Sequence, residues 1–130
     1  MILVDVNVAM YLVGADEGLK RRARAIAERA IEARERLVTD AEVFQEILHR
    51  YVAIRRPDAI EPCTSALLAL VDQVFPIELE DVRRASSLVR ASPLAARDAL
   101  HVAIMQRHGI DQIMSFDRAF DGIPGLTRLS

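Results

Sequence analysis

Residues 2–7 read Ile-Leu-Val-Asp-Val-Asn, and this stretch sets the fold class that we expect. A short β-branched run that ends in a carboxylate is typical of a buried strand. Asn7 follows the strand, and we expect it to cap a short apolar segment over Val8–Val13. The stretch therefore predicts a strand that leads into a helix, with the carboxylate of Asp5 between them.

Strands and helices alternate along the rest of the chain. Apolar spacing predicts helices over residues 19–36, 40–54, 59–71, 80–90 and 95–108. Further strands are predicted over residues 37–39, 73–77, 112–114 and 126–129. Gly109 stands where a left-handed helix cap belongs. The alternation predicts a three-layer α/β/α sandwich around a central, mostly parallel sheet of four to five strands.

Composition narrows the class of protein. The 130 residues fit one domain spanning 1–130, and 52% hydrophobic residues can fill its core. Of the 17 basic residues, 16 are arginine, and the net charge is −2. Cys63 is alone, which excludes an internal disulfide framework and a cysteine-based zinc site. The sequence has neither a signal peptide nor an apolar run of about 18 residues, so we expect a cytoplasmic protein.

Polar side chains follow three of the predicted strands. Asp5 ends the first strand, Thr39 and Asp40 end the second, and Ser115 and Asp117 follow the fourth. Ligands bind beyond the carboxyl ends of the strands in open α/β sheets. We therefore expect these side chains to meet at one edge of the sheet.

Two predicted helices add further acids. Glu46 lies two turns into the helix after the second strand, with Glu42 one turn earlier on the same side. Asp98 stands on an otherwise apolar helix, where a carboxylate is costly unless a cation meets it. Converging acids repel one another, and a divalent cation removes that repulsion. Carboxylate ligands without cysteine suit Mg²⁺ or Mn²⁺, which can activate water at a phosphate site.

Several of these acids also have ordinary structural interpretations. Asp5 can accept turn hydrogen bonds, Asp117 can cap a turn before Arg118, and Glu46 can be a solvated helix acid. Glu42 is more typical of a surface acid. Asp121 precedes Gly122 and is more typical of a turn than of a ligand. These alternatives remain open at the level of the sequence.

The chain resembles the PIN-domain ribonucleases of the VapC type, the toxins of bacterial toxin–antitoxin pairs. The resemblance rests on residues 2–7, 45–48, 97–103 and 115–121, in that order. It implies a PIN-like fold, an RNA substrate, a homodimer and a cognate VapB-like antitoxin. Two departures from the family pattern are Val6, where Thr or Ser is frequent, and Ala95, where a Ser or Thr often begins the helix.

The resemblance also implies roles for individual residues. The implied metal site consists of Asp5, Glu46, Asp98 and Asp117, and it is supported by Asn7 and Ser115. We expect Asp5 and Asp98 to hold the principal Mg²⁺, or Mn²⁺, directly. Glu42 competes with Glu46 for the helix position, and the Glu-Ile-Leu context favours Glu46. Arg97 and Arg118 are candidates for phosphate contacts, or alternatively for pairs with neighbouring acids.

Three other functions compete with a nuclease. Glu46 with His49, and Asp98 with His101, resemble the Glu-x-x-His pairs of di-iron four-helix bundles. A phosphoacceptor receiver domain would need a lysine late in the sheet, but the only lysine is Lys20. An inactive PIN-fold RNA-binding module would keep the fold without the activity. The four acids argue against this last alternative.

Overall fold

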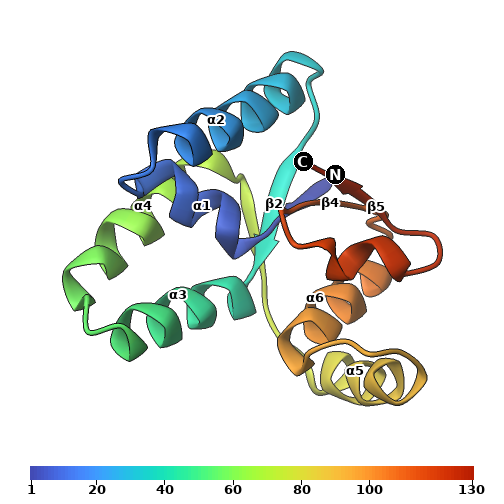
Figure 1. Cartoon of the computed structure of the whole chain (residues 1–130). Helices are drawn as coiled ribbons and strands as arrows, with labels where there is room; N and C mark the ends of the chain where they lie inside the picture. Colours follow the sequence, from blue (N-terminus) through green and yellow to red (C-terminus); the bar gives the residue numbers. More distant parts are fainter.

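The computed structural model describes residues 1–130 and contains a five-stranded sheet (Figure 1). The strands are β1 (Ile2–Val4), β2 (Leu37–Asp40), β3 (Gln73–Phe75), β4 (Gln112–Met114) and β5 (Thr127–Leu129). Their order across the sheet is β3-β2-β1-β4-β5, and every neighbouring pair is parallel. The predicted α/β class is confirmed, with all five strands parallel.

Helices cover both faces of this sheet. They are α1 (Val6–Val13), α2 (Glu17–Glu32), α3 (Ala41–Ala53), α4 (Ile60–Leu70), α5 (Leu79–Ala91) and α6 (Ala96–Arg107), with short 3₁₀ turns η1 (Pro57–Ala59) and η2 (Arg118–Gly122). The helices α1 to α4 gather on one side, and α5 and α6 pack together on the other (Figure 1). None of these helices combines the length and the apolar character that a membrane-spanning segment requires.

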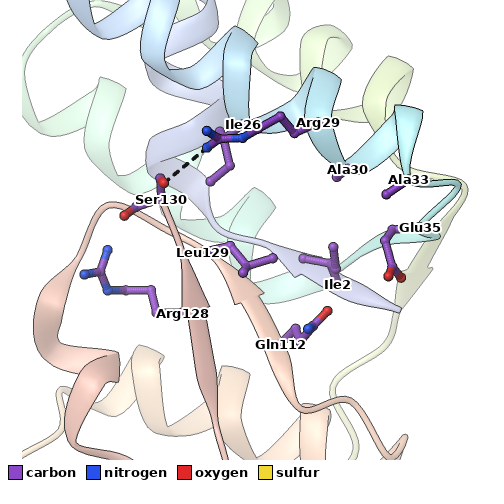
Figure 2. A pocket seen from close by; sticks show the side chains of 10 residues that line it. All are labelled: Ile2, Ile26, Arg29, Ala30, Ala33, Glu35, Gln112, Arg128, Leu129 and Ser130. Atoms are coloured by element: carbon purple, nitrogen blue, oxygen red, sulfur yellow. Dashed lines mark hydrogen bonds between the residues drawn. The ribbon is translucent and has the colours of Figure 1, made fainter.

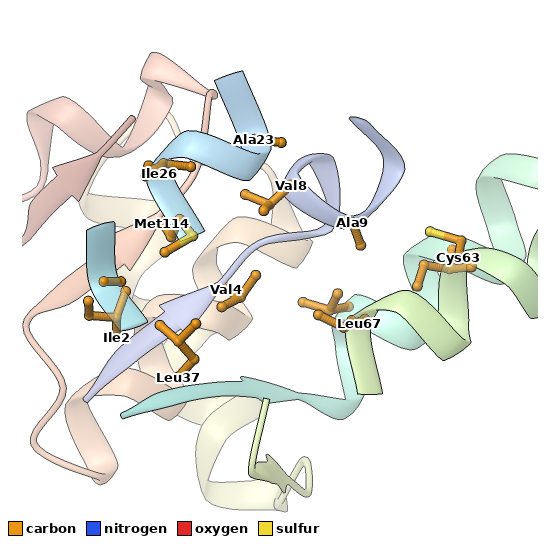
Figure 3. Packing of buried hydrophobic residues seen from close by; sticks show 13 residues of the cluster. Ile2, Val4, Val8, Ala9, Ala23, Ile26, Leu37, Cys63, Leu67 and Met114 are labelled. Atoms are coloured by element: carbon orange, nitrogen blue, oxygen red, sulfur yellow. The ribbon is translucent and has the colours of Figure 1, made fainter. Parts of the chain in front are cut away.

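The two halves of the core follow from the alternation of side chains along each strand. Ile2 and Val4 of β1 point to one face, where they join Val8 and Leu67 in a buried cluster (Figure 3). Leu3 points to the opposite face, into a second cluster that contains residues of α6 and β4. Because β1 is the middle strand, both of its faces are covered and its sequence is apolar throughout.

The start of α1 differs from the prediction. Asp5, and not Asn7, is the cap residue, because the Asp5 carboxylate accepts the backbone N–H of Val6. The strand therefore passes into the helix through a single residue, and Asn7 lies in the first turn of α1. The predicted cap at Gly109 is confirmed, since this glycine has a φ of +67° directly after the end of α6.

Two predicted element ends also differ from the structure. The third strand ends at Phe75 rather than residue 77, because Pro76 has no N–H for a strand ladder. Helix α2 ends at Glu32 rather than near residue 36, and Arg34 beyond it has a positive φ of 57°. Neither difference moves a predicted site residue.

The sheet order creates a switch point beside β1. From β1 the chain builds β2 and β3 on one side, and it then returns to place β4 on the other side. Ligand sites in open α/β sheets lie at the carboxyl ends of the strands that flank such a reversal. In this chain those ends carry Asp5 after β1 and Ser115 after β4.

Candidate active site

Asp5 is held rigidly at the end of β1. Its side chain is 4% exposed, and its backbone N–H donates to the Met114 carbonyl of β4. One carboxylate oxygen, Oδ1, accepts the Val6 N–H at 2.8 Å. The other, Oδ2, accepts the Ser115 hydroxyl at 2.5 Å and the Asn7 amide at 3.2 Å. Both oxygens therefore have fixed directions.

Asn7 and Ser115 join the ends of β1 and β4. Asn7 Nδ2 donates to Ser115 Oγ at 3.2 Å, and Asn7 Oδ1 accepts the Phe116 N–H at 3.2 Å. Ser115 Oγ also accepts the Asp117 N–H at 3.0 Å. The structure thus brings both residues into hydrogen-bond contact with Asp5.

Asp98 and Glu46 come to the same place from two helices. Asp98 of α6 is 8% exposed and Glu46 of α3 is 7% exposed. Burial raises the pKa of Asp98 to about 6, with the negative charges of Asp5, Asp117 and Glu46 contributing to this rise and the nearby His101 opposing it. Burial likewise raises the pKa of Asp5. The four predicted acids therefore converge closely enough to act on one another.

Asp117 differs from the other three acids because it is exposed. It begins η2, and its Oδ1 accepts the Ala119 N–H at 2.9 Å, so it is a cap residue. The second carboxylate oxygen, Oδ2, accepts no hydrogen bond within the chain. Asp121 instead forms an ion pair with Arg128 at 2.7 Å, as expected for an acid outside the cluster.

The contacts of His101 with Asp40 and Glu46 were not predicted from the sequence. It is fully buried, with its Nδ1 2.7 Å from Asp40 Oδ2 and its Nε2 2.6 Å from Glu46 Oε1. Burial lowers the pKa of this histidine, but the two carboxylates outweigh burial and hold the pKa well above its usual range. Because carboxylates only accept hydrogen bonds, the charged imidazolium donates to both.

Glu42 and Arg97 lie at the edge of the cluster. Glu42 is half-buried, burial raises its pKa, and it makes no hydrogen bond within the chain. Arg97 is exposed, and its Nε lies 3.9 Å from Glu46 Oε2. The structure therefore places Glu46, rather than Glu42, inside the network of buried acids. Arg118 is exposed at the start of η2.

The donor set fits a hard divalent cation. Ligand atoms of Asp5, Glu46 and His101 lie within 4.8 Å of one another, and Asp98 is close enough to interact with all three. Burial is the main cause of the raised pKa values of Asp5 and Asp98, and a cation among these acids would favour their charged forms. Several carboxylate oxygens around one position are the kind of ligands that Mg²⁺ and Mn²⁺ prefer.

A sequence profile of the PIN domain matches residues 2–126 of this chain. The chain belongs to the PIN-domain family. It is 55% identical to ribonuclease VapC13 of Mycobacterium tuberculosis, over the full length of both proteins. Its structure is similar to VapC20 of the same organism, a toxin that cleaves the sarcin–ricin loop, with a TM-score of 0.71 and 21% identity over 90% of each chain.

The PIN fold also recurs in a toxin–antitoxin complex from Klebsiella pneumoniae. The TM-score is 0.68 at 20% identity, and the match covers 98% of this chain and 96% of the other. The full-length identity with VapC13 places this PIN domain among the VapC ribonucleases, which are enzymes. The resemblance proposed from four short stretches of sequence is thereby confirmed.

The di-iron alternative is not favoured for this PIN domain. A four-helix bundle is absent, because the centre of the molecule is a five-stranded sheet. The proposed pairs also fail, since His49 is exposed and His101 is bonded to Asp40 and Glu46.

A cavity of about 460 Å³ lies at the opposite end of the PIN sheet. Ile2 and Gln112, the first residues of β1 and β4, line it, and Arg29 donates to the backbone oxygen of Ser130 across it (Figure 2). It contains none of the four predicted acids. The cavity is therefore separate from the acidic cluster, which lies beyond the carboxyl ends of β1 and β4.

Proposed function

We propose that this PIN-domain protein is a Mg²⁺- or Mn²⁺-dependent endoribonuclease and the toxin of a toxin–antitoxin pair. The observation that carries the proposal is the meeting of Asp5, Glu46, Asp98 and Asp117 beside the switch point of the sheet. Full-length identity of 55% with VapC13 supports the same activity. The matched profile over residues 2–126 supports a single PIN domain.

The side chains of the site have distinct roles in this proposal. Asp5 and Asp98 hold the cation directly, and Glu46 and Asp117 complete its surroundings, directly or through water. The bound cation supplies Lewis-acid stabilisation and lowers the pKa of a water molecule. Ser115 and Asn7 fix the Asp5 carboxylate, so that its geometry does not change when substrate binds.

The reaction needs no covalent nucleophile from the chain. Water adds to phosphorus, the P–O bond to the departing nucleoside breaks, and the products are a phosphate monoester and a hydroxyl group. The net charge of −2 would be +2 without the four site carboxylates, so neutralising them removes much of the repulsion against RNA. Arg97 and Arg118 provide phosphate contacts beside the cluster.

Partners follow from the same proposal. A cognate VapB-like antitoxin binds this toxin and blocks the acidic site, and two copies of the chain form a homodimer. The structural similarity to the Klebsiella toxin–antitoxin complex supports an antitoxin partner. Purification of the toxin with and without the chain encoded beside it, followed by mass measurement in solution, tests both statements.

A nuclease assay tests the activity. Purified protein is incubated with total RNA and Mg²⁺ or Mn²⁺, and wild type is compared with Asp5→Asn and Asp98→Asn. Both substitutions preserve size, and Asn still caps helices, so the fold should survive. The control is Asp58→Asn, an exposed acid paired with Arg56 at 2.9 Å and outside the acidic cluster.

We expect cleavage by wild type and Asp58→Asn, and a loss of at least 100-fold in the two site variants. Equal cleavage by wild type and all three variants would show that Asp5 and Asp98 do not belong to the active site. Cation-independent binding of RNA without cleavage would instead favour the inactive RNA-binding module. Growth arrest on expression, relieved by the same two substitutions, separates a toxin from a housekeeping nuclease.

A further inference from the structure

Asp40, His101 and Glu46 are joined by a buried series of hydrogen bonds, and the proposed reaction assigns a role to Glu46 alone among them. The His101 ring lies between the two acids, at 2.7 Å from Asp40 and 2.6 Å from Glu46. Asp40 and His101 are 0% exposed and Glu46 is 7% exposed. Three ionisable groups in such a place are costly unless their geometry is well defined.

At one end of this series of hydrogen bonds, the Asp40 side chain is held in place by the backbone. It is the last residue of β2, and its Oδ1 accepts the Val43 N–H and so caps α3. Its Oδ2 is left for His101. The preceding residue, Thr39, donates its hydroxyl to the Val4 carbonyl, which ties this corner to β1. His101 is therefore hydrogen-bonded to a carboxylate whose position is set by both the sheet and the first turn of α3.

At the other end of this series of hydrogen bonds, the Glu46 side chain is the more flexible partner. It lies on α3, and its flexible side chain would otherwise sample several rotamers. The contact with His101 occupies Oε1, while Oε2 remains on the side of Arg97, at 3.9 Å. The contact with the ring therefore restrains the Glu46 carboxylate through Oε1, and Oε2 accepts no hydrogen bond within the chain.

Proximity alone would suggest that His101 is itself a metal ligand, because its ring lies near Asp5 and Glu46. Its hydrogen bonds indicate otherwise. A metal-bound histidine uses a nitrogen lone pair, but both ring nitrogens of His101 face carboxylate oxygens at hydrogen-bond distance. Binding a cation would require the ring to give up the contact with Glu46.

We propose that His101 is a positioning residue of the nuclease site, held by Asp40, which presents Glu46 Oε2 to the cation and does not bind the cation itself. This inference rests on the proposed function, because it assumes that the acidic cluster holds a divalent cation. Groups that orient a metal ligand typically change metal affinity or activity by about 10- to 100-fold when they are removed.

Two substitutions separate positioning from simple core packing. In His101→Gln the side-chain amide nitrogen reaches the position of Nε2, so the contact with Glu46 can persist. In His101→Asn the amide nitrogen lies where Nδ1 was, so the contact with Asp40 can persist but Glu46 is released. Both variants lose the ring, and both place a neutral amide in the core.

Mn²⁺ affinity, measured by electron paramagnetic resonance, is the first measurement. We expect His101→Gln to stay within about threefold of wild type, and His101→Asn to lose about 10- to 100-fold. For RNA cleavage we expect kcat to fall in His101→Asn with little change in KM. Equal losses in both variants, or no loss in either, would show that the ring only fills space.

A spectroscopic signature decides between positioning and ligation. Electron spin-echo modulation of the Mn²⁺-loaded wild-type protein should show no directly bonded nitrogen. A strong nitrogen coupling that disappears in both variants would overturn the inference. Asp40→Asn is a further variant, because Asn keeps the helix cap but weakens the contact with His101. Because the contact with Glu46 can persist in Asp40→Asn, as it can in His101→Gln, its Mn²⁺ affinity should lie closer to that of His101→Gln than to that of His101→Asn, with circular dichroism showing an intact fold. A loss as large as that of His101→Asn would contradict the inference.

These outcomes remain distinct from failure of the proposed function. If wild type binds Mn²⁺ but cleaves no RNA, the nuclease proposal fails, and the ranking of Mn²⁺ affinities still tests the role of His101. If wild type binds no Mn²⁺ at millimolar concentration, the premise of a cation site fails and the inference fails with it.

Discussion

Ser115 Oγ lies 2.5 Å from Asp5 Oδ2, although the two residues are 110 positions apart in the chain. This hydrogen bond joins the carboxyl ends of β1 and β4, on the two sides of the switch point. Hydrogen bonds to a carboxylate are stronger than those between neutral groups. The contact therefore fixes the direction in which Asp5 faces its neighbouring acids.

Replacing Ser115 with alanine should release Asp5 without removing any acid. We expect Ser115→Ala to fold and to lose about 10- to 100-fold in Mn²⁺ affinity or in RNA cleavage. Isothermal titration with Mn²⁺ and a fluorescent RNA assay measure these effects. Ser87→Ala, an exposed serine on α5, is the matched control and should behave as wild type. A Ser115→Ala protein as active as this control would contradict the prediction.

Asp98 should give the metal-free protein an unusual dependence on pH. Its pKa rises from 3.8 to about 6 on folding, so the folded state binds the proton more tightly than the unfolded state does. The stabilising contribution is complete below about pH 4 and is lost as the pH rises through about 6. The Asp98→Asn variant does not undergo this loss. The difference in melting temperature between the variant and wild type should therefore become more favourable to the variant as the pH rises from 4.5 to 7.5.

The control for this measurement is Asp121→Asn, because the pKa of Asp121 is lowered on folding whereas that of Asp98 is raised. A hydrogen bond from Arg128 lowers the pKa of Asp121, so its stabilising contribution is present near neutral pH and is lost in acid. Thermal melts in the presence of EDTA measure both variants. The prediction for Asp98 fails if the two variants change with pH in the same direction.

Divalent cations should stabilise the folded protein. A ligand that binds only the folded state at 100 times its Kd contributes about 2.7 kcal/mol, which raises the melting temperature by several degrees. Thermal melts with increasing Mg²⁺ should show this shift for wild type and Asp58→Asn. Asp98→Asn should show a much smaller shift at the same concentrations. An identical shift in all three proteins would place the cation elsewhere.

Arg97 and Arg118 should contribute to RNA affinity through charge. Each phosphate contact on single-stranded nucleic acid adds about 0.7 to the slope of log affinity against log salt. In an inactive Asp98→Asn background, Arg97→Ala or Arg118→Ala should weaken binding and reduce the slope by about this amount. Arg56→Ala removes an arginine already paired with Asp58, so it is the control. Unchanged slopes would exclude both arginines from the RNA path.

Much of the fold could be predicted from local sequence patterns. The apolar residues of β1, the helical spacing of later segments and Gly109 after α6 each specify an element through short-range chemistry. The alternation of strands and helices then restricts the topology, because parallel strands need right-handed crossovers. The cap of α1 was assigned to the wrong residue because both Asp5 and Asn7 are good cap residues.

The sequence by itself determined which acids were available and which strand ends carried them, because strand polarity places Asp5 and Asp117 at the same edge. The sequence context favoured Glu46 over Glu42, but only the tertiary structure shows that Glu46 is hydrogen-bonded to His101 of α6 while Glu42 lies at the edge of the cluster. The Asp40–His101 contact joins residues 61 positions apart. Hydrogen bonds of this kind depend on how helices pack across a sheet, and no local periodicity encodes that packing.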